Sequence, residues 1–289
     1  MSEYKLIGHD STLEKFSNLY RNNMFPNKIL LSGMKGIGKS LIVNYFLLKV
    51  FNSNNDYQLI NNNSHPNILN IKKNIDKKNI EINQIREITK FTNQSSFNNK
   101  SRFIIIDDAE ALNINSSNAL LKNLEEPNEN VYFILIYNSE KFLFDTIKSR
   151  CIEYKIKISY ENTKIIVNNY FNNNIFEQIN VDLINYYSTP FFLISLINYL
   201  NENELSISDT SIDDLLINLI NNKDYIKQDF IKENLNMIIE LFFYNHINIT
   251  KKITYKIKEY YYAKLSNVRK FNLDYETFFL EFKDKLLSE

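Results

Sequence analysis

The sequence predicts an α/β domain with a parallel sheet, followed by a helical region that makes up the rest of the chain. Three observations support this fold class. An apolar run, a glycine-rich loop and an apolar helical segment follow one another at residues 28–51. Further apolar runs at 102–110 and 131–138 alternate with helical patterns, as expected of a parallel sheet covered on both faces. After about residue 155 only helical patterns remain.

The first elements follow from local patterns. Residues 12–20 space their apolar side chains as a short amphipathic helix does. The run KILLSG, 28–33, is typical of a buried strand, and a helix is expected at 41–51. Residues 52–79 are expected to form a surface loop that contains a short strand at 68–71.

Two more helices are expected between the later strands. The segment 80–91 places three isoleucines on one helical face. The segment 115–127 has signals at both ends: Asn115 or Ser116 is expected to cap its start, and Pro127 to end it.

The chain is accordingly divided into three predicted domains: an α/β domain at 1–155, a small helical domain at 156–205 and a C-terminal helical domain at 206–289. Segments with helical periodicity in the last two are 161–171, 181–200, 213–220, 233–245 and 275–287.

Composition restricts the class of protein. The 34 basic and 34 acidic residues balance, which leaves only local patches for nucleic-acid binding. Cys151 is the only cysteine, which excludes an internal disulfide and a cysteine-based metal cluster. The N-terminal segment lacks an apolar signal core, and the apolar stretch at 191–200 is well short of the ~20 residues of a spanning helix. We therefore expect a soluble cytoplasmic protein with no membrane partner.

The loop GMKGIGKS fits the phosphate-binding pattern of Gly, four free residues, Gly-Lys and Ser or Thr. Its glycines, Gly33, Gly36 and Gly38, let backbone N–H groups turn toward phosphate oxygens. Lys39 is expected to reach the β and γ phosphates and Ser40 to ligate Mg²⁺. The alternative is a glycine-rich turn without a ligand. Because the chain has only 4 glycines, three of them within six residues favour a real or ancestral phosphate loop. A working loop would hold Mg-ATP or ADP, whereas an ancestral one would remain only as a scaffold.

Polar side chains follow two of the predicted strands. Asp107 is expected to contact Mg²⁺ through water, and Asp108 stands where many such proteins carry a glutamate base. Asp108 is shorter than glutamate by one C–C bond, about 1.5 Å. Asn138 could orient the attacking water or the γ-phosphate. The alternative for each is a polar residue that simply ends a buried strand.

Two motifs make the sequence recognisable. The run NALLKNLEEP followed by the triplet SRC at 149–151 resembles the clamp loader of bacterial DNA polymerase III, an assembly of AAA+ proteins, and is most similar to its zinc-free delta-prime subunits. Further stretches fall in the order of that family: IGHDSTLEKF, the glycine-rich loop, SHPNIL, IEINQIREI, FIIIDDAEALN and NLD at 272–274.

The resemblance implies an AAA+ domain, a helical lid and a C-terminal helical collar. The collar would join this chain to motor subunits and a delta subunit in a ring that loads the sliding clamp onto primed DNA. Arg150, within SRC, would be an arginine finger acting in trans on ATP held by a neighbouring motor subunit. Such a finger is worth ~10³–10⁵ in rate because it stabilises charge on the transferring phosphoryl group.

Departures from the family pattern point to little or no intrinsic ATPase activity. Phe192 stands where ATP-hydrolysing relatives carry a lid arginine, and Asp108 stands where they carry glutamate. Residues 52–66, where many members hold zinc with four cysteines, contain no cysteine. His65 alone cannot replace a four-ligand site, so no zinc is expected.

Two other functions remain open from sequence: an ATP-hydrolysing clamp-loader motor subunit, and an autonomous phosphotransferase. The second needs several arginines to clamp two anionic substrates, whereas this chain has five scattered ones. A third possibility, direct DNA binding by a lysine-rich stretch, competes with its usual meaning, a solvated loop. The lysines are Lys72, Lys73, Lys77 and Lys78.

Overall fold

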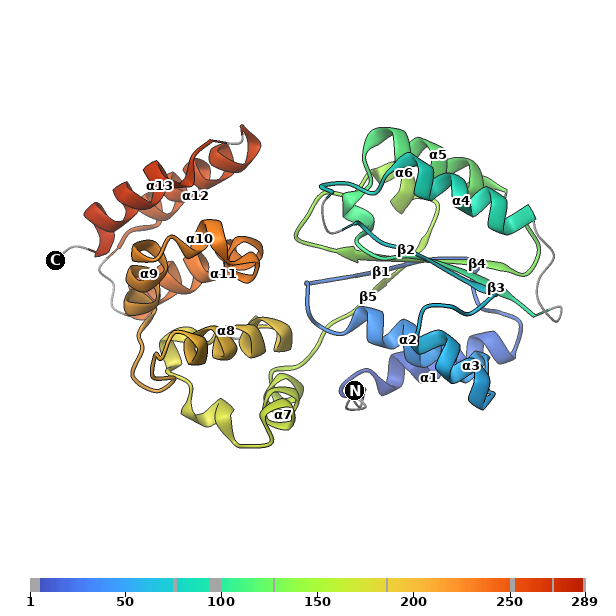
Figure 1. Cartoon of the computed structure of the whole chain (residues 1–289), viewed down its shortest axis with the longest axis horizontal. Coiled ribbons are helices and arrows are strands. Elements are labelled where there is room, and N and C mark those ends of the chain that lie inside the picture. The colour runs from blue at the N-terminus through green and yellow to red at the C-terminus, as the bar shows by residue number, and fades with distance from the viewer. Residues whose placement is uncertain are drawn as a thin grey trace. The chain divides into compact units, whose positions relative to one another are not determined.

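The structure is a computed structural model of the chain. It describes residues 6–74, 77–93, 100–126, 128–185, 187–249, 253–271 and 273–287. The chain divides into two compact units, Met1–Asn162 and Thr163–Glu289, which are described separately (Figure 1). It is α/β up to the last strand and helical after it, which confirms the predicted fold class. The further division of the helical part into lid and collar stays a prediction.

Within the described residues, the first unit contains one sheet of five parallel strands in the order β2-β3-β4-β1-β5. The strands are β1 (Lys28–Gly33), β2 (Ile68–Ile71), β3 (Arg102–Ile106), β4 (Val131–Asn138) and β5 (Ile152–Lys155). Because every pair is parallel, the carboxyl ends of all strands meet at one edge of the sheet. The register pairs Gly33 of β1 with Asn138 of β4 at that edge.

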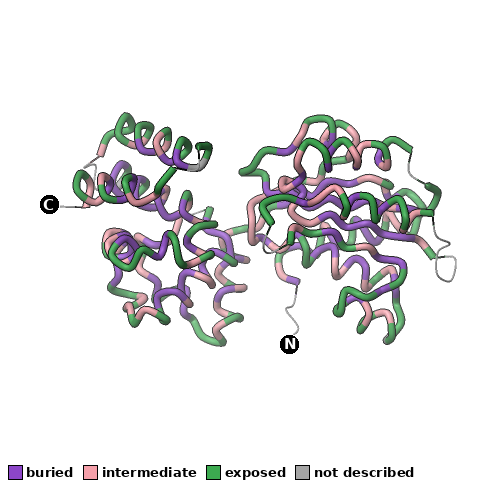
Figure 2. Tube along the Cα trace, turned by 45° about the horizontal axis from the view of Figure 1, so that its top comes forward, coloured by how far each residue is buried: buried purple, intermediate pink, exposed green. Residues whose placement is uncertain are grey.

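Helices cover both faces of this sheet, as predicted (Figure 1). One face carries α1 (Asp10–Arg21), α2 (Lys39–Val50) and α3 (Asn54–Asn61); the other carries α4 (Ile82–Asn93), α5 (Ile114–Glu125) and α6 (Asp145–Lys148). Successive residues of β3 point to opposite faces, so Phe103 packs in the first core and Ile104 in the second. Figure 2 shows the strands as largely buried.

The structure corrects the predicted start of α5. The N-cap is Asn113, whose side chain accepts a hydrogen bond from the backbone N–H of Ser116 at 2.9 Å. The proposed caps Asn115 and Ser116 are wrong, because both lie inside the first turn. Ser116 is fully buried there and its hydroxyl donates to the carbonyl of Ile80. Pro127, expected to end the helix, lies outside the described residues.

Several elements were not predicted, among them α3, β5, α6 and a helix at Tyr255–Lys270. The helix α3 lies within the expected loop at 52–79, and Ser53 caps it by accepting from the N–H of Asp56. The edge strand β5 has an exposed or half-buried side chain at every position, so it lacks the apolar run that marks a buried strand. The short strand expected at 68–71 is confirmed.

In the described part of the second unit every regular element is a helix. Its helices are α7 (Tyr160–Phe171, which begins in the first unit), α8 (Pro190–Glu202), α9 (Ile212–Asn221), α10 (Asp224–Lys227), α11 (Asp229–Tyr244), α12 (Tyr255–Lys270) and α13 (Tyr275–Phe282). The expected helix at 181–200 begins only at Pro190, because Thr189 caps it and accepts from the N–H of Phe192. Asn272 lies outside the described residues.

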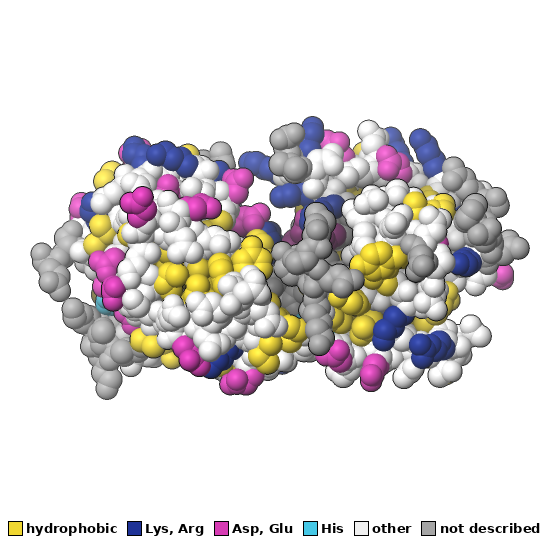
Figure 3. Space-filling model, turned by 60° about the horizontal axis from the view of Figure 1, so that its bottom comes forward, with side chains coloured by type: hydrophobic (Ala, Val, Ile, Leu, Met, Phe, Trp, Pro, Cys, Tyr) yellow, Lys and Arg dark blue, Asp and Glu magenta, His cyan; other side chains and the backbone are white. Residues whose placement is uncertain are grey.

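The surfaces of the two units carry apolar side chains as well as charged ones (Figure 3). The exposed apolar side chains of the second unit include Val181, Tyr187 and Phe191. Among the residues that the structure describes, no helix is both long enough and apolar enough to cross a membrane.

Candidate nucleotide site

The glycine-rich loop joins β1 to α2 at the carboxyl edge of the sheet. Gly38 is the N-cap of α2 and has a φ of 93°, in the left-handed region that other residues rarely adopt. At Gly33 a Cβ atom would lie 2.5 Å from the carbonyl oxygen of Ile156 and 2.7 Å from the Cδ1 atom of Ile37. Gly36 lies in the intervening turn. Glycine is therefore required by backbone conformation at one end of the loop and by close packing at the other.

Lys39, the first residue of α2, is almost completely buried. Its ammonium donates hydrogen bonds to the carbonyls of Gly33 (2.7 Å) and Met34 (2.6 Å). Burial lowers the pKa of Lys39 to about 8, although nearby carboxylates, first Glu110 and then Asp107, oppose that effect. A partly desolvated cation thus lies on the loop beside the positive end of the α2 dipole, a combination suited to phosphate oxygens.

Ser40 and Asp107 come together beside this loop. The hydroxyl of Ser40 donates to Oδ2 of Asp107 at 3.3 Å, and Nζ of Lys72 lies 3.3 Å from the same oxygen. The other carboxylate oxygen of Asp107 accepts from the N–H of Asp108 at 3.1 Å. A hydroxyl and a carboxylate in contact are oxygen ligands of the kind that Mg²⁺ prefers. These residues therefore fit a magnesium–nucleotide complex.

The other two polar residues predicted for the site, Asp108 and Asn138, do not contact the loop through their side chains in the way that Lys39 does. Asp108 has a left-handed backbone, with a φ of 57°, in the turn that follows β3. Asn138 ends β4 and is buried, and its side-chain oxygen accepts from the N–H of Glu140 at 3.2 Å. Its backbone N–H donates to Oε2 of Glu110 at 3.0 Å. The amide oxygen of Asn138 thus contacts its own turn rather than the loop.

Glu110 and His9, which lie near the site, were not singled out from sequence, and Lys72 was considered only as a possible DNA contact. Lys72 and Glu110 contact the predicted acidic and amide residues, as described above. His9, the N-cap residue of α1, lies with its Nε2 atom 2.6 Å from the carbonyl oxygen of Ile37 and supports the loop from beneath. Glu110 had a sequence signal as the third acidic residue of the strand-ending run IIIDDAE, and Lys72 as a member of the lysine-rich stretch.

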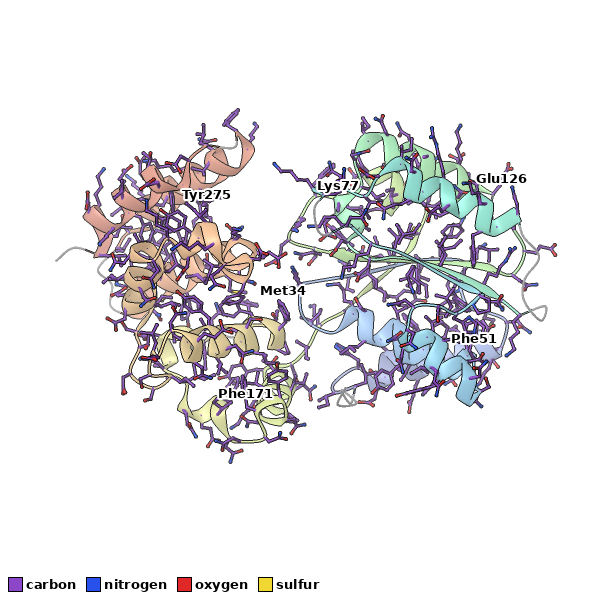
Figure 4. The ribbon with its side chains drawn as sticks, in the orientation of Figure 1. Met34, Phe51, Lys77, Glu126, Phe171 and Tyr275 are labelled. Atoms are coloured by element: carbon purple, nitrogen blue, oxygen red, sulfur yellow. The ribbon has the colours of Figure 1, made fainter. Side chains whose placement is uncertain are left out.

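Arg150 lies away from the loop. Its guanidinium is 2.7 Å from Oε1 of Glu125, at the end of α5, and also donates to the carbonyl of Thr146 at 2.9 Å. The neighbouring carbonyl of Leu124 accepts from the ammonium of Lys28, the first residue of β1. This end of α5 therefore lies at the amino edge of the sheet. Figure 4 shows the same separation, with Met34 and Glu126 at opposite ends of the sheet.

The residues associated with zinc and with the lid have structural partners of their own. His65 is buried; its Nε2 atom lies 3.3 Å from Asp56, and its Nδ1 atom accepts from the N–H of Asn67. Burial lowers the pKa of His65, although Asp56 opposes that effect. Both ring nitrogens thus contact protein groups. Phe192 is buried in the second unit against Phe230.

A parallel sheet, a phosphate-type loop after β1 and an acidic turn after β3 together define a P-loop protein of the α/β class. A family model described as "DNA polymerase III, delta subunit" matches residues 8–159, more than half of the chain. The chain belongs to this family, and its resemblance to clamp-loader subunits is confirmed.

Relatives come from more than one kind of clamp-loader subunit. The delta-prime subunit of Pseudomonas aeruginosa is 30% identical over 134 residues, covering 43% of this chain and 41% of that protein. The gamma subunit of Buchnera aphidicola from Schizaphis graminum is 31% identical over 165 residues, covering 54% and 45%. The matches thus span less than half the length of these curated relatives.

Among solved structures, a gamma subunit-related protein from Thermotoga maritima is 18% identical with a TM-score of 0.43, covering 83% of this chain and 74% of that one. At that TM-score the similarity carries no weight for function.

Proposed function

We propose that this chain is the delta-prime subunit of a DNA polymerase III clamp loader, which joins motor subunits and a delta subunit in loading the sliding clamp onto primed DNA. The observation that carries the proposal is the place of Arg150. Its guanidinium lies at the edge of the sheet opposite the chain's own loop, so it is poorly placed to act on a nucleotide held by Lys39. It is suited to a nucleotide held by another subunit.

The contacts of Arg150 fit such a role in trans. The side chain is about one-third exposed, and that of Glu125 is about half exposed. An exposed ion pair of this kind is worth at most about 1 kcal/mol. The guanidinium can therefore exchange Glu125 for the phosphate oxygens of a neighbouring subunit at small cost. The backbone N–H of Arg150 meanwhile donates to the carbonyl of Ile147 in α6 at 3.1 Å.

The chain's own loop is proposed to hold Mg-ATP or ADP with little turnover. Lys39 supplies the cation for the phosphates, and Ser40 with Asp107 supplies oxygen ligands for the metal. Magnesium, when bound, neutralises phosphate charge. The shorter Asp108 occupies the place of the water-activating base, and Phe192 that of the lid arginine, so hydrolysis is expected to be slow.

Reconstitution with the motor, delta and clamp proteins of the same organism tests the proposal. Native mass spectrometry should find this chain in the ring, and loading of clamps onto primed DNA should stop when the chain is omitted. A chain that stays outside the ring, with loading unaffected, would contradict the proposal.

A motor subunit is the second candidate, because the loop is intact and the gamma subunits are relatives of similar identity. A motor subunit would be identified by ATP turnover of this chain that clamp and DNA stimulate and that Lys39→Ala abolishes. Membership of the clamp-loader family disfavours the autonomous phosphotransferase.

A further inference from the structure

His9 is a buried polar side chain that the proposed nucleotide chemistry does not use. It is the N-cap residue of α1 and only 3% exposed, and within the described residues its side chain does not cap that helix. Instead, its Nε2 atom lies 2.6 Å from the carbonyl oxygen of Ile37, 28 residues later in the glycine-rich loop. A side chain that contacts this loop rather than its own helix points to a role in the loop.

The partner of His9 determines which ring nitrogen carries a proton. A carbonyl oxygen can only accept a hydrogen bond, so Nε2 must be the donor. The bond is short for an N–H···O contact, and it is buried, where an unpaired carbonyl would be costly. His9 therefore holds the carbonyl of Ile37 on its own side of the loop.

The same contact sets the direction of the next N–H group. In a trans peptide the carbonyl of Ile37 and the N–H of Gly38 lie in one plane and point in opposite directions. With the carbonyl directed to His9, this N–H faces away from the imidazole, and among the described residues it donates to no protein group. Because Gly38 is the N-cap of α2, its N–H is one of the donors that a phosphate at this helix end would need.

Glycine makes this orientation depend on an anchor. Gly38 has a φ of 93°, and turning its peptide with Ile37 over by half a turn would bring φ to about −87°, which glycine adopts as readily. The turned peptide would present the carbonyl oxygen of Ile37 to the phosphate in place of the N–H, and the two oxygens would repel each other. The hydrogen bond from His9 selects between these two orientations.

Packing holds the imidazole in place for this contact. A Cβ atom on Gly38 would lie 3.4 Å from Nε2 of His9, so the ring packs against the glycine whose peptide it anchors. A Cβ atom on Gly8 would lie 2.6 Å from Nδ2 of Asn162, which also belongs to the first unit. The turn that begins α1 thus lies between the glycine-rich loop and Asn162.

We propose that His9 is a positioning residue of the nucleotide site, which holds the peptide between Ile37 and Gly38 in the orientation where its N–H can donate to a phosphate oxygen. This inference rests on the proposed binding of nucleotide by that loop. It does not require His9 to touch the nucleotide. Without the donor, binding weakens by the fraction of molecules left in the competent orientation, and we expect a loss on the order of tenfold.

Two substitutions separate the hydrogen bond of His9 from the bulk of its side chain. His9→Gln retains an N–H donor at about the reach of Nε2, whereas His9→Leu keeps a similar volume without a donor. Ser17→Ala is the matched control, because Ser17 is also buried on α1 and its hydroxyl donates to the carbonyl of Leu13 at 2.7 Å. Ser17 lies about two helical turns beyond His9. A general loss of helix stability would therefore lower affinity in Ser17→Ala as well.

The experiment is a titration of each purified full-length protein with fluorescent ADP and Mg²⁺ at neutral pH. Lys39→Ala tests the site itself, and thermal unfolding verifies that each variant is folded. A second measurement is made on wild type without ligand. The chain has 3 histidines, and ¹⁵N NMR of the labelled imidazoles shows which ring nitrogen of each carries a proton. The signals of His9 are those that His9→Gln lacks.

The outcomes are distinct. We expect His9→Leu to bind about tenfold more weakly than wild type, His9→Gln and Ser17→Ala to bind within about twofold of it, and Nε2 of His9 to carry a proton. Wild-type affinity in His9→Leu, an equal defect in folded His9→Gln, or a bare Nε2 would overturn the role of His9. With Lys39→Ala still defective, the nucleotide site would stand.

If His9→Leu does not fold, the affinity of His9→Gln and the proton on Nε2 decide in the same way. No binding by wild type would overturn both proposals.

Discussion

Raising the pH should weaken nucleotide binding by the glycine-rich loop, because the ammonium of Lys39 titrates within an accessible range. Burial lowers its pKa to about 8, whereas an exposed lysine stays charged to about 10. Phosphate oxygens bind the charged form, and binding therefore takes up a proton wherever the unliganded lysine is neutral. Affinity is therefore nearly full at pH 7, about one unit below this pKa, and it declines as the pH rises through 8.

The magnitude follows from this pKa. For one titrating group that is fully charged in the complex, the dissociation constant rises about tenfold between pH 7 and pH 9. The terminal phosphates are already largely ionised above neutral pH, so they contribute little to this change. Calorimetric titration with ADP and Mg²⁺ across the range measures it, and heats in buffers of different ionisation enthalpy count the proton taken up.

Lys39→Arg is the comparison variant, because a guanidinium stays charged throughout this range. Its dissociation constant should not change with pH, whatever its absolute value. A flat wild-type profile between pH 7 and pH 9, or an equal decline in Lys39→Arg, would refute the assignment of the titration to Lys39.

Three further predictions concern the packing of the glycine-rich loop, the cap of α5 and the ion pair of Lys72. Gly33→Ala should destabilise the protein by about 2–4 kcal/mol in urea unfolding, because the new Cβ would lie 2.5 Å from the carbonyl oxygen of Ile156; an unchanged midpoint would contradict the close packing. Asn113→Ala should cost about 1 kcal/mol by removing the cap of α5, whereas Asn115→Ala, at an exposed position, should cost almost nothing; equal effects would refute the assigned cap. Lys72→Ala should lower the Mg²⁺ concentration needed for nucleotide binding, by at most about fivefold since the ion pair is exposed; an unchanged requirement would show that Lys72 does not compete with the metal.

The central strands could be predicted because they are buried and therefore consist mainly of apolar residues. Every residue of β3 is buried, and the sequence RFIII is correspondingly apolar except at its first position. The edge strand β5 leaves Ile152 more than half exposed, so its sequence carries neither a continuous apolar run nor a clear alternation. It is defined by its pairing with β1, which a local pattern does not encode.

Some residues of the candidate site could likewise be predicted from sequence, and others could not. Lys39 and Ser40 could be predicted, because the loop that holds them is contiguous in sequence. Glu110 could not be given its place, because its partner is the backbone N–H of Asn138, 28 residues later on another strand. The contact between Arg150 and Glu125 likewise depends on how α5 and α6 pack, which motif spacing does not specify.

The helix caps show how closely the sequence alone can locate the start of a helix. Asn113 and Asn115 are both suitable cap residues two positions apart, and propensity does not choose between them. The choice depends on which register buries Ser116 beneath the carbonyl of Ile80. Tertiary packing therefore fixes the start of α5, and the sequence narrows it only to within one turn.

The most direct test of the account is ATP turnover by the reconstituted clamp loader with Arg150→Ala in this chain. Arg86→Ala serves as control, because Arg86 lies exposed on α4, where its guanidinium donates to Oδ1 of Asn83 at 3.3 Å. Assembly, followed by native mass, should be unchanged in both variants. Arg150→Ala should remove the contribution of one nucleotide site from the phosphate burst, since a finger is worth ~10³–10⁵ in rate at the site that it serves. A burst equal in amplitude and rate to that of wild type, in a fully assembled ring, would contradict the account.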